Sequence, residues 1–296
     1  VTFLGEITEL NGYAFQNCTA LQSFTIPSTV TVLGNYVFAG SGLTSITIPG
    51  TLERTHTYTK SNLTKDGYTF QDCTALETVV IEEGFLYLNG TTFKGCTALK
   101  NVTLPASLTT VGSSCFEGCT ALAGISFPSG MEGSIGGSAF KDCSALTSMT
   151  FAEGSKITSI GASAFIGTGL TTIKLPATLL SIGTSAFTGT GLTSIEIPAS
   201  ATSIGASAFA GCASLTSVTF AAGSELNSIG AGAFKETGLT SITLPENVEK
   251  LTLGANLFEG CATLGSVTLG NSVNAISASM FLNCTALTSL TIPANV

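Results

Sequence analysis

The chain has 296 residues and a net charge of −8, and only 9 % of its residues are charged. This charge excludes nucleic acid as a partner, because phosphates require a basic protein surface. No apolar run approaches the roughly 20 residues of a membrane span, so we expect no membrane insertion in this segment.

A phenylalanine recurs at a nearly constant interval along the whole chain. Ten of the eleven intervals are 22–25 residues, and the other, from Phe38 to Phe70, is 32. This period predicts a solenoid, in which each repeat packs on its neighbours. We therefore predict a single domain over residues 1–296 with about twelve rungs, both chain ends being cut in mid-rung. The twelve phenylalanines are Phe15, Phe38, Phe70, Phe93, Phe116, Phe140, Phe165, Phe187, Phe209, Phe234, Phe258 and Phe281.

Each rung begins with a predicted strand of the pattern Leu-x-x-Ile-x-Ile, as in residues 192–197. Ile195 and Ile197 are two residues apart, which is the period of a half-buried strand. All eight prolines follow this pattern, as Pro198 does, and a proline without an N–H ends the strand. Of the 24 outward positions on the twelve strands, 19 are Ser or Thr. We therefore predict a sheet face lined with hydroxyl groups.

A turn is predicted between the strand and the phenylalanine. Gly stands four residues before Phe in eight rungs, as at Gly205, and Asn, Asp or Ser replaces it in the other four. Gly, Asn and Asp best tolerate a positive φ, so we expect a turn at this point. The Ala208–Phe209 step that follows is expected to form a short helical or 3₁₀ turn outside the sheet.

Eight of the nine cysteines stand three residues after a repeat phenylalanine, and only Cys115 breaks this rule. One cysteine at one position per rung predicts a column of small buried side chains with free thiols. Disulfides between neighbours stay possible, because stacked rungs should lie about 5 Å apart. The spacing shows no zinc pattern of two cysteines two residues apart. In some rungs a Gly-Thr-Gly turn, as in residues 189–191, replaces the cysteine.

The strand, turn and link patterns together resemble the BspA-like, or Treponema-type, leucine-rich repeat family. The motifs are Leu-x-x-Ile-x-Ile-Pro, Ile-Gly-x-x-Ala-Phe and Cys-x-x-Leu, and they cover essentially the whole chain. The resemblance implies a right-handed superhelix with a parallel β-sheet on its concave face. It also implies a secreted or surface-displayed protein, from a bacterium or a mucosal protozoan, that adheres to host or neighbouring cells.

Catalytic motifs are incomplete in this sequence. Gly161-Ala-Ser163-Ala-Phe165 lacks the closing glycine of a nucleophile elbow and recurs in other rungs. The chain has a single histidine, His56. A histidine-rich metal site is therefore excluded, and no other histidine could act as the base for a catalytic serine. We therefore predict that the protein is not an enzyme and uses no cofactor or metal.

One rung is irregular. From Pro49 to Phe70 the chain runs 21 residues, where other rungs use 11–13, so we treat residues 50–66 as an insertion loop in the third rung. Insertions in solenoids map to loops that often bind ligands, although a solvated surface loop is the alternative. The candidate ligand-binding residues here are Arg54, His56, Tyr58, Lys60 and Lys65. If residues 54–60 alternate as in a strand, the first four of these residues lie on one face.

Two further candidate ligand-binding residues, Lys174 and Glu196, lie on the predicted strand face. They occupy the same outward column on adjacent predicted strands, where we expect a surface ion pair. They are the charged exceptions in a face that is otherwise rich in hydroxyl groups.

Together with what the family resemblance implies, these observations predict a monomeric extracellular or cell-surface recognition module that adheres to a host or matrix protein or a glycan. The first alternative is a passive spacer within a larger surface protein. A more remote alternative is binding to an ordered surface, such as ice or a crystalline polysaccharide, through the Ser/Thr array.

Overall fold

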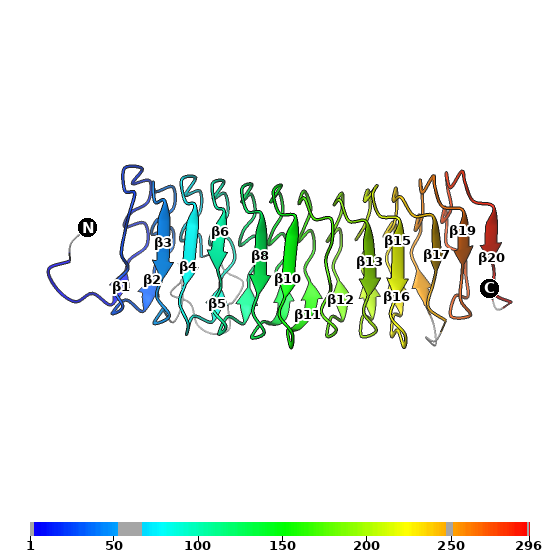
Figure 1. Cartoon of the computed structure of the whole chain (residues 1–296), viewed down its shortest axis with the longest axis horizontal. Helices are drawn as coiled ribbons and strands as arrows, with labels where there is room; N and C mark the ends of the chain where they lie inside the picture. Colours follow the sequence, from blue (N-terminus) through cyan, green and yellow to red (C-terminus); the bar gives the residue numbers. More distant parts are fainter. Residues whose placement is uncertain (1–2, 53–66, 247–250, 295) are drawn as a thin grey trace. The chain divides into compact units, whose positions relative to one another are not determined.

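The computed structural model describes residues 3–52, 67–246, 251–294 and 296. Two compact units make up the chain, Val1–Ser155 and Lys156–Val296, and the prediction of a single domain stays a prediction. Each unit is a β-solenoid with parallel sheets (Figure 1). Among the described residues there is no helix, and hence no helix that could cross a membrane.

In the first unit, five of the six predicted Leu-x-x-Ile-x-Ile segments form strands, in two parallel sheets (Figure 1). Residues 21–26 form no strand, so the prediction of one there was wrong. The register of the paired strands aligns equivalent positions, so Ile46 pairs with Val79, and Val79 pairs with Val102. Apolar side chains point inward and polar ones outward, which confirms the half-buried strand prediction. One sheet is β3 (Ser45–Ile48), β4 (Thr78–Ile81) and β6 (Asn101–Thr103), and the other is β8 (Gly124–Phe127) and β10 (Ser148–Phe151).

The second unit repeats this arrangement. Ile195 and Ile197 are buried, whereas Ser194 and Glu196 are exposed, and Ile195 pairs with Val218 of the next rung. One sheet is β13 (Ser194–Ile197) and β15 (Ser217–Phe220), and the other is β17 (Ser241–Thr243), β19 (Ser266–Thr268) and β20 (Ser289–Thr291).

A second set of short strands precedes the glycine turns, and the sequence analysis did not predict it. Its signal is an apolar residue directly before the glycine, as in Ser203-Ile204. In the first unit these strands are β1 (Glu9–Leu10), β2 (Val32–Leu33), β5 (Tyr87–Leu88), β7 (Thr110–Val111) and β9 (Glu132–Ile135). In the second unit they are β11 (Lys156–Ile160), β12 (Ser181–Ile182), β14 (Ser203–Ile204), β16 (Ser228–Ile229) and β18 (Thr252–Leu253).

The glycine four residues before Phe has another role than the predicted one. Gly205 does not have a positive φ; instead, a Cβ placed there would lie 2.5 Å from the backbone nitrogen of Thr184 in the preceding rung. Glycine is needed because two backbones approach closely. The turn was predicted correctly, but the reason given for its glycine was wrong.

The short turns expected outside the sheet are present as single turns, and the described residues form no helix there. Ala186 N–H bonds to Gly183 C=O at 3.2 Å, and Thr188 N–H bonds to Ser185 C=O at 3.2 Å. The second of these bonds spans the Ala186–Phe187 step from residue i to residue i+3, as in a single 3₁₀ turn. Ser185 has φ 56° and Gly189 has φ 70°. A helix requires consecutive residues with right-handed backbone angles. Ser185 and Gly189, two positions before and two after Phe187, have left-handed angles, so no helix forms between them.

The repeat phenylalanines form the centre of each unit. Phe187 is fully buried and stacks on Phe165 at 5.0 Å and on Phe209 at 5.3 Å between ring centroids. In the first unit, Phe38 and Phe70 stack at 5.4 Å although 32 residues separate them in the sequence. The extra residues of the third rung therefore leave the stacking on both sides intact.

Candidate functional site

The outward face of the long strands is lined with hydroxyl groups, as predicted. In the first unit, Thr150 donates a hydrogen bond from Oγ1 to Ser126 Oγ at 2.9 Å across neighbouring strands. In the second unit, Thr219 and Thr243 are exposed on β15 and β17. Hydroxyl groups both donate and accept hydrogen bonds, so this face suits a polar ligand.

The insertion residues proposed from the sequence lie outside the described residues. Arg54, His56, Tyr58, Lys60 and Lys65 all fall within residues 53–66. Their role in binding stays a prediction.

Lys174 and Glu196 are both exposed, but the structure does not place them as expected. Residues 171–176 form no strand, because one backbone hydrogen bond, from Thr193 N–H to Thr171 C=O at 3.1 Å, is too little for a ladder. The described part of the chain shows no ion pair between Lys174 and Glu196. The prediction of a cross-strand pair is therefore wrong.

A groove lies between β15 and β17, where two sheets of the second unit meet without a ladder. Its volume is about 510 Å³. Directly before the lining residues of the two rungs, Thr240 N–H and Thr216 C=O form a long hydrogen bond of 3.5 Å. The groove is lined by residues 217–224 and 241–246.

The described lining of this groove is polar and apolar in about equal parts. Thr219 and Thr243 belong to it, and Glu246 is the one carboxylate among its described residues. The sequence analysis missed Glu246 and the buried Ser224. A signal was present, because residues 220–224, Phe-Ala-Ala-Gly-Ser, lack the usual proline after the strand. The described lining residues offer hydrogen bonds to a ligand and include no pair of groups for acid–base catalysis.

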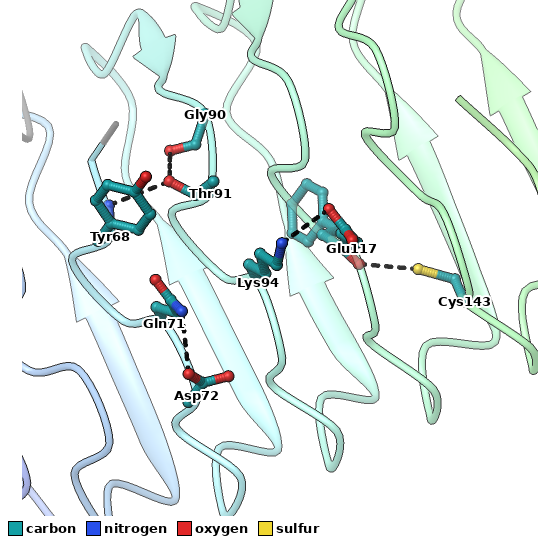
Figure 2. A network of polar contacts seen from close by, with 9 residues as sticks. Tyr68, Gln71, Asp72, Gly90, Thr91, Lys94, Glu117 and Cys143 are labelled. Carbon is teal, nitrogen blue, oxygen red and sulfur yellow. Dashed lines mark hydrogen bonds and ion pairs between the residues drawn. The ribbon is translucent and has the colours of Figure 1, made fainter. Parts of the chain in front are cut away.

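The cysteines are structural donors in this fold. Cys143 donates from Sγ to the carbonyl oxygen of Phe116 in the preceding rung at 3.0 Å, close to the Lys94–Glu117 ion pair of 3.2 Å (Figure 2). All nine cysteines are free thiols, and seven are buried as predicted. Cys18 is exposed and Cys284 is half-buried, because they belong to the first and last described rungs, which have a neighbour on one side only.

Burial makes most of these thiols poor nucleophiles. Desolvation raises the pKa of Cys96, Cys115 and Cys119 well above that of a free thiol. A hydrogen bond with Cys96 lowers the pKa of Cys73, but the Cys73 side chain is fully buried. No cluster of three or more metal-ligating side chains occurs in the part of the chain that is described.

The repeat pattern of the chain matches a known family model along its whole length. The family model described as "BspA type Leucine rich repeat region (6 copies)" matches residues 1–65, 66–192 and 180–296. The chain belongs to this family. The resemblance deduced from the strand, turn and link motifs is thereby confirmed. No curated protein matches the chain.

Several solved structures of leucine-rich repeat proteins are similar to this BspA-type chain. A protein from Bacteroides ovatus is 27 % identical, with 100 % of this chain and 86 % of that chain covered and a TM-score of 0.64. A leucine-rich cell surface protein from Faecalibacterium prausnitzii is 22 % identical, covering 98 % and 88 %, with a TM-score of 0.46. The T. pallidum leucine-rich repeat protein is 21 % identical, covering 79 % and 76 %, with a TM-score of 0.39.

Proposed function

We propose that this chain is a non-enzymatic recognition module, extracellular or on a cell surface, that adheres to a host or matrix protein or a glycan. The observation that carries the proposal is the hydroxyl-lined sheet face with the groove between β15 and β17. Membership of the BspA-type family supports it, since repeats of this kind present extended binding surfaces. The bacterial relative from Bacteroides ovatus supports a bacterial origin.

The chemistry of the groove favours recognition over catalysis. Neutral hydroxyl groups, such as those of Thr219 and Thr243, give hydrogen bonds to a polar ligand. Glu246 adds a single negative charge, so the groove suits neutral or cationic polar groups rather than anions. A groove of about 510 Å³ holds one or two residues of a glycan or peptide, within the usual size of ligand pockets.

The test is a binding screen of the purified chain against a glycan array and a panel of matrix proteins. The site variant replaces Thr219→Lys and Thr243→Lys together, which fills the groove with two long side chains. The control is Ser144→Lys, which adds charge in an exposed turn away from the sheet face. Loss of binding in the double variant alone supports the proposal.

Other outcomes distinguish the alternatives. Binding that survives the double variant but is lost when residues 53–65 are replaced moves the site to the insertion. No binding in any format favours the passive spacer. Inhibition of ice growth, or binding to a crystalline polysaccharide that the double variant abolishes, favours the ordered-surface alternative.

A further inference from the structure

The chain contains two asparagine–glycine steps, Asn11–Gly12 and Asn89–Gly90, and a leucine precedes each of them. Each step lies in the turn before a repeat phenylalanine, where the asparagine replaces the usual glycine. Asparagine is a thermolabile residue, and a following glycine has no side chain to keep its backbone nitrogen away from the asparagine amide. The two Leu-Asn-Gly segments are therefore equal in chemistry, and only their surroundings in the fold distinguish them.

The first step is open to solvent. Asn11 and Gly12 are both exposed. Its backbone makes one long hydrogen bond, from Ala14 N–H to Asn11 C=O at 3.4 Å. Among the described residues, neither the side-chain amide of Asn11 nor the N–H of Gly12 has a hydrogen-bond partner. The Asn11 side chain can therefore turn towards the backbone nitrogen of Gly12 without breaking any contact.

The second step is enclosed by its neighbours. Gly90 is buried and Asn89 is half-buried. The carbonyl oxygen of Asn89 accepts a hydrogen bond from Thr92 Oγ1 at 2.9 Å. The carbonyl oxygen of Gly90 accepts one from Thr91 Oγ1 at 2.7 Å (Figure 2) and another from Gly67 N–H in the preceding rung at 3.1 Å. Rotation of the backbone here requires these bonds to open, which has a free-energy cost that the first step does not have.

We propose that Asn11 is a site of deamidation in the native protein and that the fold protects Asn89. The backbone nitrogen of Gly12 attacks Cγ of Asn11, the Cγ–Nδ2 bond breaks, and ammonia leaves with the proton of the Gly12 N–H. Water, which reaches this exposed turn, then opens the cyclic imide. Opening at Cγ gives aspartate, opening at the main-chain carbonyl gives isoaspartate, and either product carries a carboxylate in place of the amide.

The isoaspartate product should loosen the contact between the first two rungs. Two inter-rung hydrogen bonds flank the step, from Gly34 N–H to Leu10 C=O and from Tyr13 N–H to Asn35 C=O, both at 2.8 Å. Isoaspartate places the side-chain methylene in the backbone between these bonds. The first rung then becomes longer between Leu10 and Tyr13, while their partners on the second rung keep their spacing.

The test follows both asparagines in the same molecule. The full chain is incubated in mildly alkaline buffer, in its native state and in urea. Peptide mapping by mass spectrometry separates the aspartate and isoaspartate forms from the amide and gives a rate for each site. In the native chain we expect Asn11 to deamidate at least tenfold faster than Asn89. In urea the two rates should become equal, because the two segments share the sequence Leu-Asn-Gly.

Two variants test the chemistry. Gly12→Ala introduces the alanine that other rungs carry at this position, such as Ala206, and its methyl group hinders the attacking nitrogen. We expect deamidation at Asn11 to slow at least tenfold and that at Asn89 to stay unchanged. A Cβ at Gly12 would lie 3.0 Å from the Asn35 carbonyl oxygen, so circular dichroism must show that the fold is retained.

Asn11→Asp is the matched control for the consequence of the reaction. It adds the same charge without lengthening the backbone. The isoaspartate form of the chain, separated by chromatography, should therefore melt at a lower temperature than Asn11→Asp. Equal melting temperatures would show that the flanking inter-rung bonds tolerate the longer backbone and would overturn the loosening of the first rung.

Three other results would overturn the proposed site. One is a native rate at Asn11 that is equal to or lower than the rate at Asn89. Another is deamidation at Asn11 that the folded Gly12→Ala variant leaves unchanged. The third is an intact Asn11 in the native chain after a period in which the chain in urea has deamidated at both positions.

Discussion

At the scale of single residues, the position three after each repeat phenylalanine is always a small hydrogen-bond donor. It is Cys, Thr or Ser in all twelve rungs. Thr190 donates to the carbonyl oxygen of Phe187 in its own rung at 2.9 Å, and Cys212 donates to the same oxygen from the next rung at 3.0 Å. Threonine in the Gly-Thr-Gly rungs thus takes the place of cysteine, which explains why the two variants alternate freely.

Truncating one ring of the phenylalanine column tests the core. Phe187→Ala should lower the free energy of unfolding by about 3–5 kcal/mol, because it leaves a cavity between Phe165 and Phe209. Denaturant unfolding measures this change. Leu180→Ala is the control, because Leu180 is a large apolar residue on the surface, and its removal should cost less than about 1 kcal/mol. Equal midpoints for Phe187→Ala and the unmodified chain would contradict the stacked column.

The thiols should differ sharply in reactivity in the native protein. Cys18 is exposed and should be alkylated first. Burial raises the pKa of Cys284 to about 11, so at pH 8 only about one thiol in a thousand is ionised and reaction is slow. The buried cysteines should react only after unfolding, as mass spectrometry of digested protein would show. Fast native labelling of Cys119 or Cys143, or intact disulfides, would contradict this order.

At the scale of elements, the sequence predicted what depends on local pattern. The strands of the long set, their ends before proline and the buried phenylalanines follow from periodicity and from the chemistry of proline, as in residues 192–198. The second set of strands was missed because its members have as few as two residues, such as Ser203–Ile204. The missing proline after β15 marks an irregular rung in the sequence. It does not predict the groove, which depends on whether β15 and β17 form a ladder, a property of two rungs together.

Loops of neighbouring rungs are joined by a carboxylate. Glu83, after β4, accepts hydrogen bonds from the backbone N–H groups of Ala106 at 2.7 Å and Ser107 at 3.2 Å, after β6. The bond from Ala106 lowers the pKa of Glu83 below its ordinary value of 4.5. A lowered pKa stabilises the fold above pH 4.5, and this contribution is lost as the pH falls through the folded pKa.

Glu83→Gln should therefore lower the melting temperature at pH 7, and the difference from the unmodified chain should shrink as the pH falls below 4.5. Thermal melts across this range measure the effect. Glu153→Gln serves as the control, because Glu153 is exposed and its replacement should leave the melting temperature at pH 7 nearly unchanged. A difference for Glu83→Gln that stays constant down to pH 2 would show that the carboxylate charge is not involved.

The insertion should be dispensable for folding. Phe38 and Phe70 stack across it, and β3 pairs with β4 in full register. Replacing residues 53–65 with a turn of ordinary length should preserve the circular dichroism spectrum and the melting temperature. If Arg54, His56, Tyr58 and Lys60 carry specificity, the same variant should lose binding to the native ligand. Loss of the fold would instead make the insertion structural.

At the scale of the whole molecule, each rung contacts chiefly the rung before it and the rung after it. The inter-rung bonds of residues 185, 187 and 189 all go to the next rung, at 2.8–2.9 Å. Such a chain should tolerate the removal of a complete rung but not of half a rung. The reason is that only a complete deletion returns the strands and the phenylalanines to their columns.

Deleting residues 188–209 should give a folded protein with a lower melting temperature, because Phe187 would then be followed by Ala210-Gly211-Cys212, a normal link sequence. Deleting residues 188–198 removes half a rung and should give a protein with an unfolded or aggregated region. Circular dichroism and size-exclusion chromatography distinguish the two. Similar behaviour of both deletions would refute nearest-neighbour stacking.

The interchangeability of the rungs also bears on how a gene for such a chain changes. Because each rung presents the same phenylalanine and the same small donor to both neighbours, a duplicated rung needs no adaptation to be accommodated. Misaligned recombination between the similar coding stretches would therefore produce foldable proteins of different lengths in a single step. We expect lineages of this protein to differ in their number of rungs more readily than at the stacked positions, while irregular features, such as the insertion at residues 50–66, move as blocks.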